Sequence, residues 1–203
     1  MLNFDCFIIA GGKSTRMKTD KLLLPFANSN LPEYIHSKIS EIFSNILIIS
    51  NSKNVYIPDC QVYKDIIQSI GPIAGIHSAL SNSKTYNSFI IGGDIPFFNP
   101  DAIMFLKDNL FQHDIIIFSE NGRNQYLFGF YSKKIIPKIE QMVNDVKIDD
   151  KPKVKLSMRD LLENTNSKVV EITELPFYHP HFFYNINTAE NYADAQLILR
   201  NLS

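Results

Sequence analysis

The sequence has little cysteine, almost no net charge and no long apolar run. Only Cys6 and Cys60 are present, far apart and beside apolar residues, which favours buried thiols in a reducing compartment over a disulfide framework. Its 20 basic and 21 acidic residues nearly cancel, so no overall field would draw it to nucleic acid or an anionic membrane. No run of about 18 apolar residues occurs, and the N-terminus lacks a positively charged leader. We therefore expect a soluble, cytoplasmic protein that binds neither nucleic acid nor membrane.

The sequence does contain an alternation of short apolar runs and longer amphipathic stretches. Isoleucine-rich runs typical of strands buried on both faces of a parallel sheet cover residues 5–10, 46–50, 88–93 and 114–119, and a further strand is expected at 125–132. Helix patterns cover 32–43, 73–81, 99–111, 135–146, 157–165 and 187–202, with N-caps at Asn99, Ser157 and Thr188. We also expect a charged connection at 146–155 and an entering strand in the aromatic-rich residues 177–184.

This alternation predicts an α/β fold: a Rossmann-like, doubly wound, mostly parallel sheet with helices on both faces. The chain has no internal repeat and no segment that forces a boundary, so we expect one domain over residues 1–203. In such a fold, ligands bind beyond the carboxyl ends of the strands.

The stretch IIAGGKSTRMKTDK follows the first expected strand and looks at first like a phosphate-binding P-loop. A P-loop requires a glycine at position 7, which is Phe7, and a dinucleotide fingerprint would need a third glycine that is also missing. Gly11 and Gly12 nevertheless lie where an unhindered backbone can donate N–H groups to a polyphosphate. Arg16 and Lys21 then supply positive charge.

The same stretch has the pattern A-G-G-x-S-x-R-M followed by D-K, which resembles the signature loop of sugar-nucleotide and cofactor nucleotidyltransferases. Three more segments follow in order: GPIAGI (71–76) preceded by Asp65, GGDIPF (92–97) and NINTAEN (185–191). Together they resemble the molybdenum cofactor guanylyltransferase family over most of the chain. The resemblance implies transfer of GMP from GTP to the terminal phosphate of molybdopterin, with release of pyrophosphate. The alternatives are transfer from CTP to the same pterin, transfer to a sugar phosphate, and a catalytically silent nucleotide-binding protein on this fold.

The resemblance also implies roles for individual residues. It implies that Asp94 holds Mg²⁺ and is catalytic together with Arg16 and Lys21, which are expected to bind the triphosphate. The expected nucleotide-binding residues are Ile9, Ala10, Gly11, Gly12, Lys21, Asn51, Asp65, Gly71, Gly75 and Asp94. Asn185 and Asn187 are expected to bind the acceptor substrate. The expected partners are GTP and molybdopterin, with transient contacts to molybdenum-insertion or molybdoenzyme proteins, and we expect a monomer.

Some residues depart from the family pattern or have a plainer interpretation. Lys18 stands where a glycine usually follows Arg-Met, Gln125-Tyr126 replaces a common His-Pro pair, and the connection between residues 145 and 155 is longer than usual. His179 and His181 lack the two further ligands that a structural zinc site requires. We interpret them as surface histidines.

Overall fold

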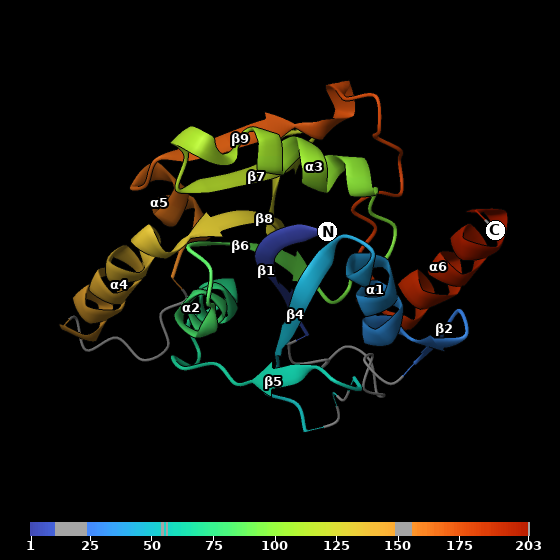
Figure 1. Ribbon diagram of the computed structural model, residues 1–203, viewed down its shortest axis with the longest axis horizontal. Coiled ribbons are helices and arrows are strands. Elements are labelled where there is room, and N and C mark those ends of the chain that lie inside the picture. The colour runs from blue at the N-terminus through green and yellow to red at the C-terminus, as the bar shows by residue number, and fades with distance from the viewer. Residues whose placement is uncertain (11–23, 54, 56, 149–155, 203) are drawn as a thin grey trace.

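The computed structural model describes residues 1–10, 24–53, 55, 57–148 and 156–202. Its central element is a seven-stranded sheet with the strand order β5-β4-β1-β6-β8-β7-β9 (Figure 1). The strands are β1 (Leu2–Ile9), β4 (Phe43–Ile49), β5 (Gln61–Tyr63), β6 (Asn87–Gly92), β7 (Ile115–Glu120), β8 (Arg123–Ser132) and β9 (Ser167–Glu171). β8 pairs antiparallel with β6 and β7, whereas the other neighbouring strands pair parallel. Short strands β2 (Pro25–Phe26) and β3 (Ser29–Asn30) form a separate hairpin.

Helices cover both faces of this sheet, so the predicted doubly wound α/β fold is confirmed (Figure 1). One face carries α1 (Leu31–Ser40), α3 (Pro100–Asp108) and α6 (Ala189–Leu202). The other carries α2 (Pro72–Asn82), α4 (Ile136–Ile148) and α5 (Met158–Glu163). Short 3₁₀ turns are η2 (Leu110–Gln112), η3 (Lys133–Ile135) and η4 (Ile172–Glu174). Within the described ranges, no helix is both long and apolar enough to cross a bilayer.

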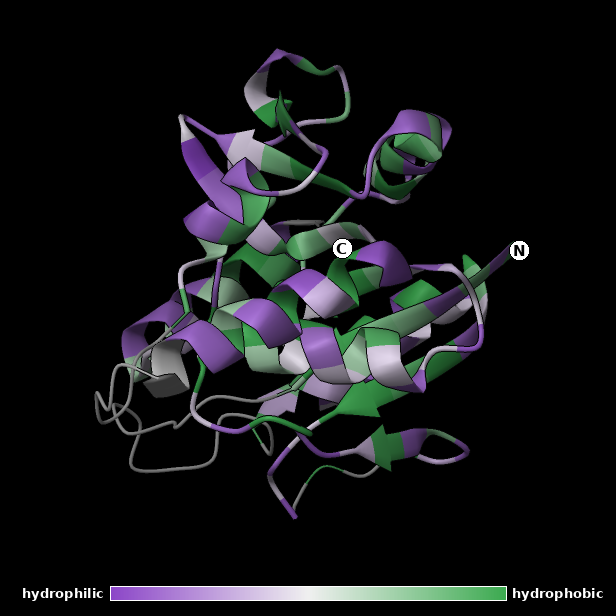
Figure 2. Ribbon diagram, turned by 90° about the vertical axis from the view of Figure 1, so that its left-hand side faces the viewer, coloured by the Kyte–Doolittle hydropathy of each residue, from purple (hydrophilic) through white to green (hydrophobic). Residues whose placement is uncertain are grey.

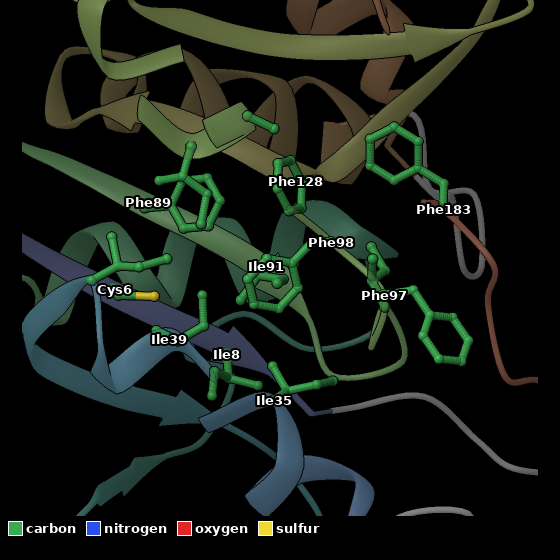
Figure 3. Packing of buried hydrophobic residues seen from close by; sticks show 14 of the residues in the cluster. Cys6, Ile8, Ile35, Ile39, Phe89, Ile91, Phe97, Phe98, Phe128 and Phe183 are labelled. Atoms are coloured by element: carbon green, nitrogen blue, oxygen red, sulfur yellow. The ribbon is translucent and has the colours of Figure 1, made fainter. Parts of the chain in front are cut away.

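The central strands are continuously apolar because their side chains alternate between two cores. In β1, Cys6 and Ile8 pack on the α1 side, while Phe7 and Ile9 pack on the α2 side. Hydrophobic residues accordingly follow the strands, and hydrophilic residues gather on the outer faces of the helices (Figure 2). Figure 3 shows the α1-side core, which is rich in phenylalanine.

The predicted helix starts are confirmed by their caps. Side-chain oxygens of Asn99, Ser157 and Thr188 each accept a backbone N–H from the first helical turn, at 2.9, 3.2 and 3.1 Å. Asn30 adds a complete capping box with Glu33 at the start of α1.

Some predictions of secondary structure are wrong. Residues 177–184 form turns, not a strand, because Pro180 lacks an N–H and the aromatic rings of Phe182 and Phe183 reach the core from a turn. The helix expected over 99–111 ends at Asp108 and continues as η2. Strands β5 and β9 were not predicted, because they lie at the sheet edges and are only partly buried. Cys6 is buried as expected, but Cys60 is only partly buried.

Candidate functional site

The carboxyl ends of β1, β4 and β6 meet at one edge of the sheet. Beyond β1, the N–H of Ala10 donates to the carbonyl of Ile49 at 2.9 Å. From the other side, the N–H of Gly93 donates to the carbonyl of Ile9, also at 2.9 Å. The hydroxyl of Ser50 then donates to the carbonyl of Ala10 at 2.6 Å. These bonds fix the backbone from which the predicted phosphate-binding loop departs.

Asp94 follows β6 and is partly exposed, whereas its neighbours on both sides are buried. The chain reaches this position by a close approach: a Cβ on Gly93 would lie 3.2 Å from both the Cα of Ala10 and the carbonyl oxygen of Ile9. Only glycine fits there without moving the end of β1. Asp94 is therefore held directly beside the predicted nucleotide-binding backbone.

The predicted acceptor-binding segment also reaches Asp94. The N–H of Ile186 donates to the carbonyl of Asp94 at 3.3 Å, which places residues 185–187 beside it. The side-chain amide of Asn185 donates to the carbonyl of Phe183 at 3.0 Å, and Asn187 is exposed. Residues about 90 positions apart in sequence thus lie together.

Asn51 and Asp65 form a reciprocal pair after β4 and β5. The amide of Asn51 donates to Oδ2 of Asp65 at 2.7 Å, and its Oδ1 accepts the N–H of Asp65 at 3.1 Å. Burial raises the pKa of the Asp65 carboxyl above its ordinary value, and the hydrogen bond from Asn51 opposes this rise. On the next residue, the N–H of Ile66 donates to the hydroxyl of Ser78 on α2 at 2.8 Å. This hydrogen bond connects the segment that carries Asp65 to α2.

Gly71 and Gly75 are each favoured as glycine, but for different structural reasons. Gly71 precedes α2 with a φ of +78°, a backbone conformation that favours glycine, and no side chain caps the first N–H groups of the helix. A Cβ on Gly75 would lie 2.9 Å from Cδ1 of Ile9. Gly75 therefore lets α2 pack closely against β1 and brings the start of the helix to the same edge.

The remaining predicted residues, Gly11, Gly12, Arg16 and Lys21, lie outside the described residues. Their roles stay predictions. The departure at Lys18 and most of the 145–155 connection also lie outside the described residues.

The chemistry of the residues at this edge can be compared with what magnesium and zinc require. Within the described part of the chain, no group of three or more His, Cys, Asp and Glu side chains could hold a metal ion. Magnesium is commonly bound by one or two carboxylates together with substrate phosphates. Asp94 is a partly exposed carboxylate at this edge, and the backbone of residues 185–187 lies beside it.

Sequence reasoning missed several residues that build this edge. Ser50 and Ser78 were not predicted, because a serine after a strand or inside a helix carries no local signal for a long-range hydrogen bond. The interpretation of His179 as a surface histidine is wrong: it is partly buried, and its Nε2 lies 2.9 Å from the carbonyl oxygen of Phe97. Burial lowers the pKa of His179. His181 is exposed, as expected.

Comparison with known proteins shows the family of this chain. The family described as the MobA-like NTP transferase domain matches residues 6–167. A protein named "Probable molybdenum cofactor guanylyltransferase" from Carboxydothermus hydrogenoformans is 29% identical over 198 residues, covering 95% of this chain and 94% of that one. A protein of the same name from Clostridium perfringens (strain ATCC 13124) is 34% identical over 203 residues, covering 96% of each chain.

The fold is shared with a solved structure as well. Molybdopterin-guanine dinucleotide biosynthesis protein A from Archaeoglobus fulgidus superposes with a TM-score of 0.79 at 19% identity, covering 98% of this chain and 100% of that one. Because the family match covers more than half of the chain, the protein belongs to the MobA-like NTP transferase family and is a nucleotidyltransferase.

Proposed function

We propose that this nucleotidyltransferase moves GMP from GTP to the terminal phosphate of molybdopterin and releases pyrophosphate, with Mg²⁺ as its cofactor. The observation that carries the proposal is the position of Asp94. Its loop is bonded to the end of β1 through Gly93 and to residues 185–187 through Ile186. A carboxylate there lies between the predicted nucleotide side and the predicted acceptor side.

The chemistry requires positioning and charge neutralisation, not a protein nucleophile. The phosphate of the acceptor has a second pKa of about 6, so it is already largely ionised at neutral pH and needs no general base. Both reactants are anions and repel each other. Positive charge must offset this repulsion, and fixed geometry must hold the reacting atoms in place. Mg²⁺, when bound, would neutralise charge on the phosphates and act as a Lewis acid.

The residues of this chain supply the rest of the reaction. Asp94 would hold the metal, with Asn185 and Asn187 toward the acceptor phosphate. Arg16 and Lys21 would neutralise the triphosphate, and Gly11 and Gly12 would let the backbone approach it.

The guanosine would bind on the other side of β1. The backbone of Ile9 and Ala10 would line it, and the uncapped start of α2 at Gly71 would face it. The Asp65 carboxylate, oriented by Asn51, is an acceptor for the N–H groups on the edge of guanine. A site that matches hydrogen-bonding groups in this way discriminates strongly, because a wrong base leaves buried polar groups unpaired.

Nucleotide binding in Mg²⁺ tests the base preference. We expect GTP to bind at least about 100-fold more tightly than CTP or ATP, and Asp65→Asn to reduce this ratio. Calorimetric titration of the three nucleotides measures it. Tighter binding of CTP would favour the cytidylyltransferase alternative, and equal binding of all three would count against a guanine site.

Asp94→Asn tests the metal. The substitution keeps the shape of the side chain but removes the charge of a ligand, so transfer should be nearly abolished while the thermal unfolding curve stays that of a folded protein. Lys107→Met, a change at a partly exposed residue of α3, is the control and should keep wild-type turnover. A folded Asp94→Asn protein with wild-type turnover would refute the metal assignment.

A further inference from the structure

The segment that follows β6, residues 94–98, has no regular secondary structure, so its carbonyl oxygens need partners from elsewhere. Described residues outside the segment donate to four of these carbonyls. The bonds join Asp94 to the N–H of Ile186 (3.3 Å), Pro96 and Phe98 to the ammonium of Lys38 (3.2 and 3.0 Å), and Phe97 to Nε2 of His179 (2.9 Å). Lys38 binds two of them with a single side chain.

Lys38 is an unusual lysine. It lies on the inner side of α1, and burial lowers its pKa, although the charge of Glu41 opposes this. Among the described residues, no carboxylate lies within ion-pair distance of its Nζ. Its charge is instead directed at two carbonyl oxygens and the ring of Phe98, whose centroid lies 4.5 Å from Nζ. Lys38 is partly buried, and removing an ammonium from water is costly, so these contacts favour its position.

The two sides of Asp94 are therefore anchored differently. On the side of β6, the N–H of Gly93 is bonded to Ile9. On the other side, Phe97 and Phe98 enter the core near Ile35 and Ile39 of α1 (Figure 3), and Lys38 binds the backbone around them. A shift of α1 or loss of its ammonium would be transmitted to Asp94 along only a few residues.

We propose that Lys38 is a positioning residue of the nucleotidyl transfer: by binding the carbonyls of Pro96 and Phe98 it fixes the direction of the Asp94 carboxylate toward the bound metal and phosphates. The inference rests on the proposed function, in which Asp94 is the metal ligand. Lys38 itself touches neither substrate nor metal in this account. Groups that orient a metal ligand typically change metal affinity or activity about 10- to 100-fold when they are replaced.

The test compares Lys38→Met, which keeps the length and apolar stem but removes the donor, with Ile39→Val on the same helix. Ile39 is fully buried and contributes to the same core, so its change lowers stability without touching the carbonyls. We would measure Mn²⁺ binding in the presence of GTP by electron paramagnetic resonance, GTP binding without metal, and the Mg²⁺ concentration that gives half-maximal turnover. Thermal unfolding of each variant reports its stability.

Lys38→Met should weaken Mn²⁺ binding about 10- to 100-fold and raise the required Mg²⁺ concentration, while GTP binding without metal stays at the wild-type value. Ile39→Val should lower the unfolding temperature. It should leave Mn²⁺ binding, GTP binding and the required Mg²⁺ concentration unchanged. If Lys38→Met binds Mn²⁺ as well as Ile39→Val does, Lys38 is merely structural and the proposal is wrong. Should Lys38→Met fail to fold, Lys38→Gln replaces it; this variant keeps one shorter donor and should also bind Mn²⁺ more weakly, and a wild-type value would again refute the proposal.

The Mn²⁺ readout does not require molybdopterin. A wild-type protein that binds Mn²⁺ with GTP but makes no pterin dinucleotide would contradict the proposed function and leave the role of Lys38 to be decided by the variants. A wild-type protein that binds no Mn²⁺ with GTP would count against both.

Discussion

At the scale of single residues, two adjacent glycines decide where the Asp94 carboxylate lies. A Cβ on Gly92 would lie 2.8 Å from Oδ1 of Asp94, whereas a Cβ on Gly93 would meet the backbone of β1. The first obstacle is the end of a side chain, which can rotate away. The second is a buried strand, which cannot move easily. The two positions therefore separate effects on the carboxylate from effects on the fold.

Gly92→Ala should lower turnover about 100-fold, because a displacement of the carboxylate by about 1 Å can cost that much in rate. It should change the unfolding temperature little, because the side chain of Asp94 can rotate away. Gly93→Ala should lower both turnover and stability. Steady-state kinetics and thermal unfolding of the two variants check this. A Gly92→Ala protein with unchanged turnover would mean that the orientation of Asp94 is not important.

At the scale of elements, the turn of the β7–β8 hairpin is held by hydrogen bonds to a residue of the neighbouring strand β9. Asn121 and Gly122 both have positive φ, as a two-residue hairpin turn requires. Partial burial would raise the pKa of the Glu171 carboxyl, but hydrogen bonds from both turn N–H groups and from two hydroxyls lower it to about 2. Glu171 thus connects the turn to β9.

The charge of Glu171 should make stability depend on pH. Its pKa is lowered on folding from 4.5 to about 2, so its contribution is fully present above pH 4.5 and is lost as the pH falls toward 2. Glu171→Gln should reduce the free energy of unfolding by about 1 kcal/mol at pH 7, a modest value because the carboxylate is partly exposed to water. Urea unfolding at pH 7, 4 and 2.5 measures the difference. A difference that stays constant or grows toward pH 2.5 would contradict this account.

The contact between α2 and β1 gives a second test at this scale. Gly75→Ala would place a methyl group 2.9 Å from Cδ1 and 3.0 Å from Cγ2 of Ile9, and such overpacking costs about 1–3 kcal/mol. Ile9→Ala removes both atoms. The double variant should therefore lose less stability than the sum of the two single variants, which a double-mutant cycle by urea unfolding detects. If the losses of unfolding free energy were simply additive, the side chain of Ile9 would not limit how closely α2 packs on β1.

The elements also show which parts of the fold could be predicted from sequence. The central strands were predictable because burial on both faces leaves a continuous isoleucine pattern, and helix starts were predictable because caps are local. Edge strands β5 and β9 have no such pattern, and the aromatic run at 177–184 fits a strand as well as a turn packed on the core. The bonds of Lys38 and His179 to residues 94–98 span about 60 and 80 positions. No local pattern carries that information, nor that of the backbone bond between Ile186 and Asp94.

At the scale of the whole molecule, the amino ends of the strands, opposite the end that carries Asp94, contribute to the stability of the fold. Asp5, which is buried, accepts hydrogen bonds from the amide of Asn45, the hydroxyl of Ser83 and the N–H groups of Lys84 and Thr85. Burial would raise the pKa of Asp5, but these bonds lower it below 3.8. The network joins β1, β4 and the segment before β6 at the amino ends of the strands, away from Asp94.

Asp5→Asn should therefore reduce the free energy of unfolding by about 1–3 kcal/mol, since an amide must present donors where only an acceptor fits. The kinetics of the folded fraction should not change. Because the folded pKa is lowered, the advantage of wild type should be present above pH 3.8 and fall below it. Urea unfolding and kinetics together check this, and a loss of turnover in a fully folded variant would contradict the separation of the two edges.

The identity of the transferred nucleotide distinguishes guanylyl transfer to molybdopterin from its alternatives. Purified protein would be incubated with molybdopterin, Mg²⁺ and each of GTP, CTP, ATP and UTP in separate reactions, with the pterin product identified by mass spectrometry and pyrophosphate quantified. We expect a pterin carrying GMP, formed together with an equal amount of pyrophosphate, and far less product with the other nucleotides. A product carrying CMP as the main adduct, or no adduct from any nucleotide, would contradict the account.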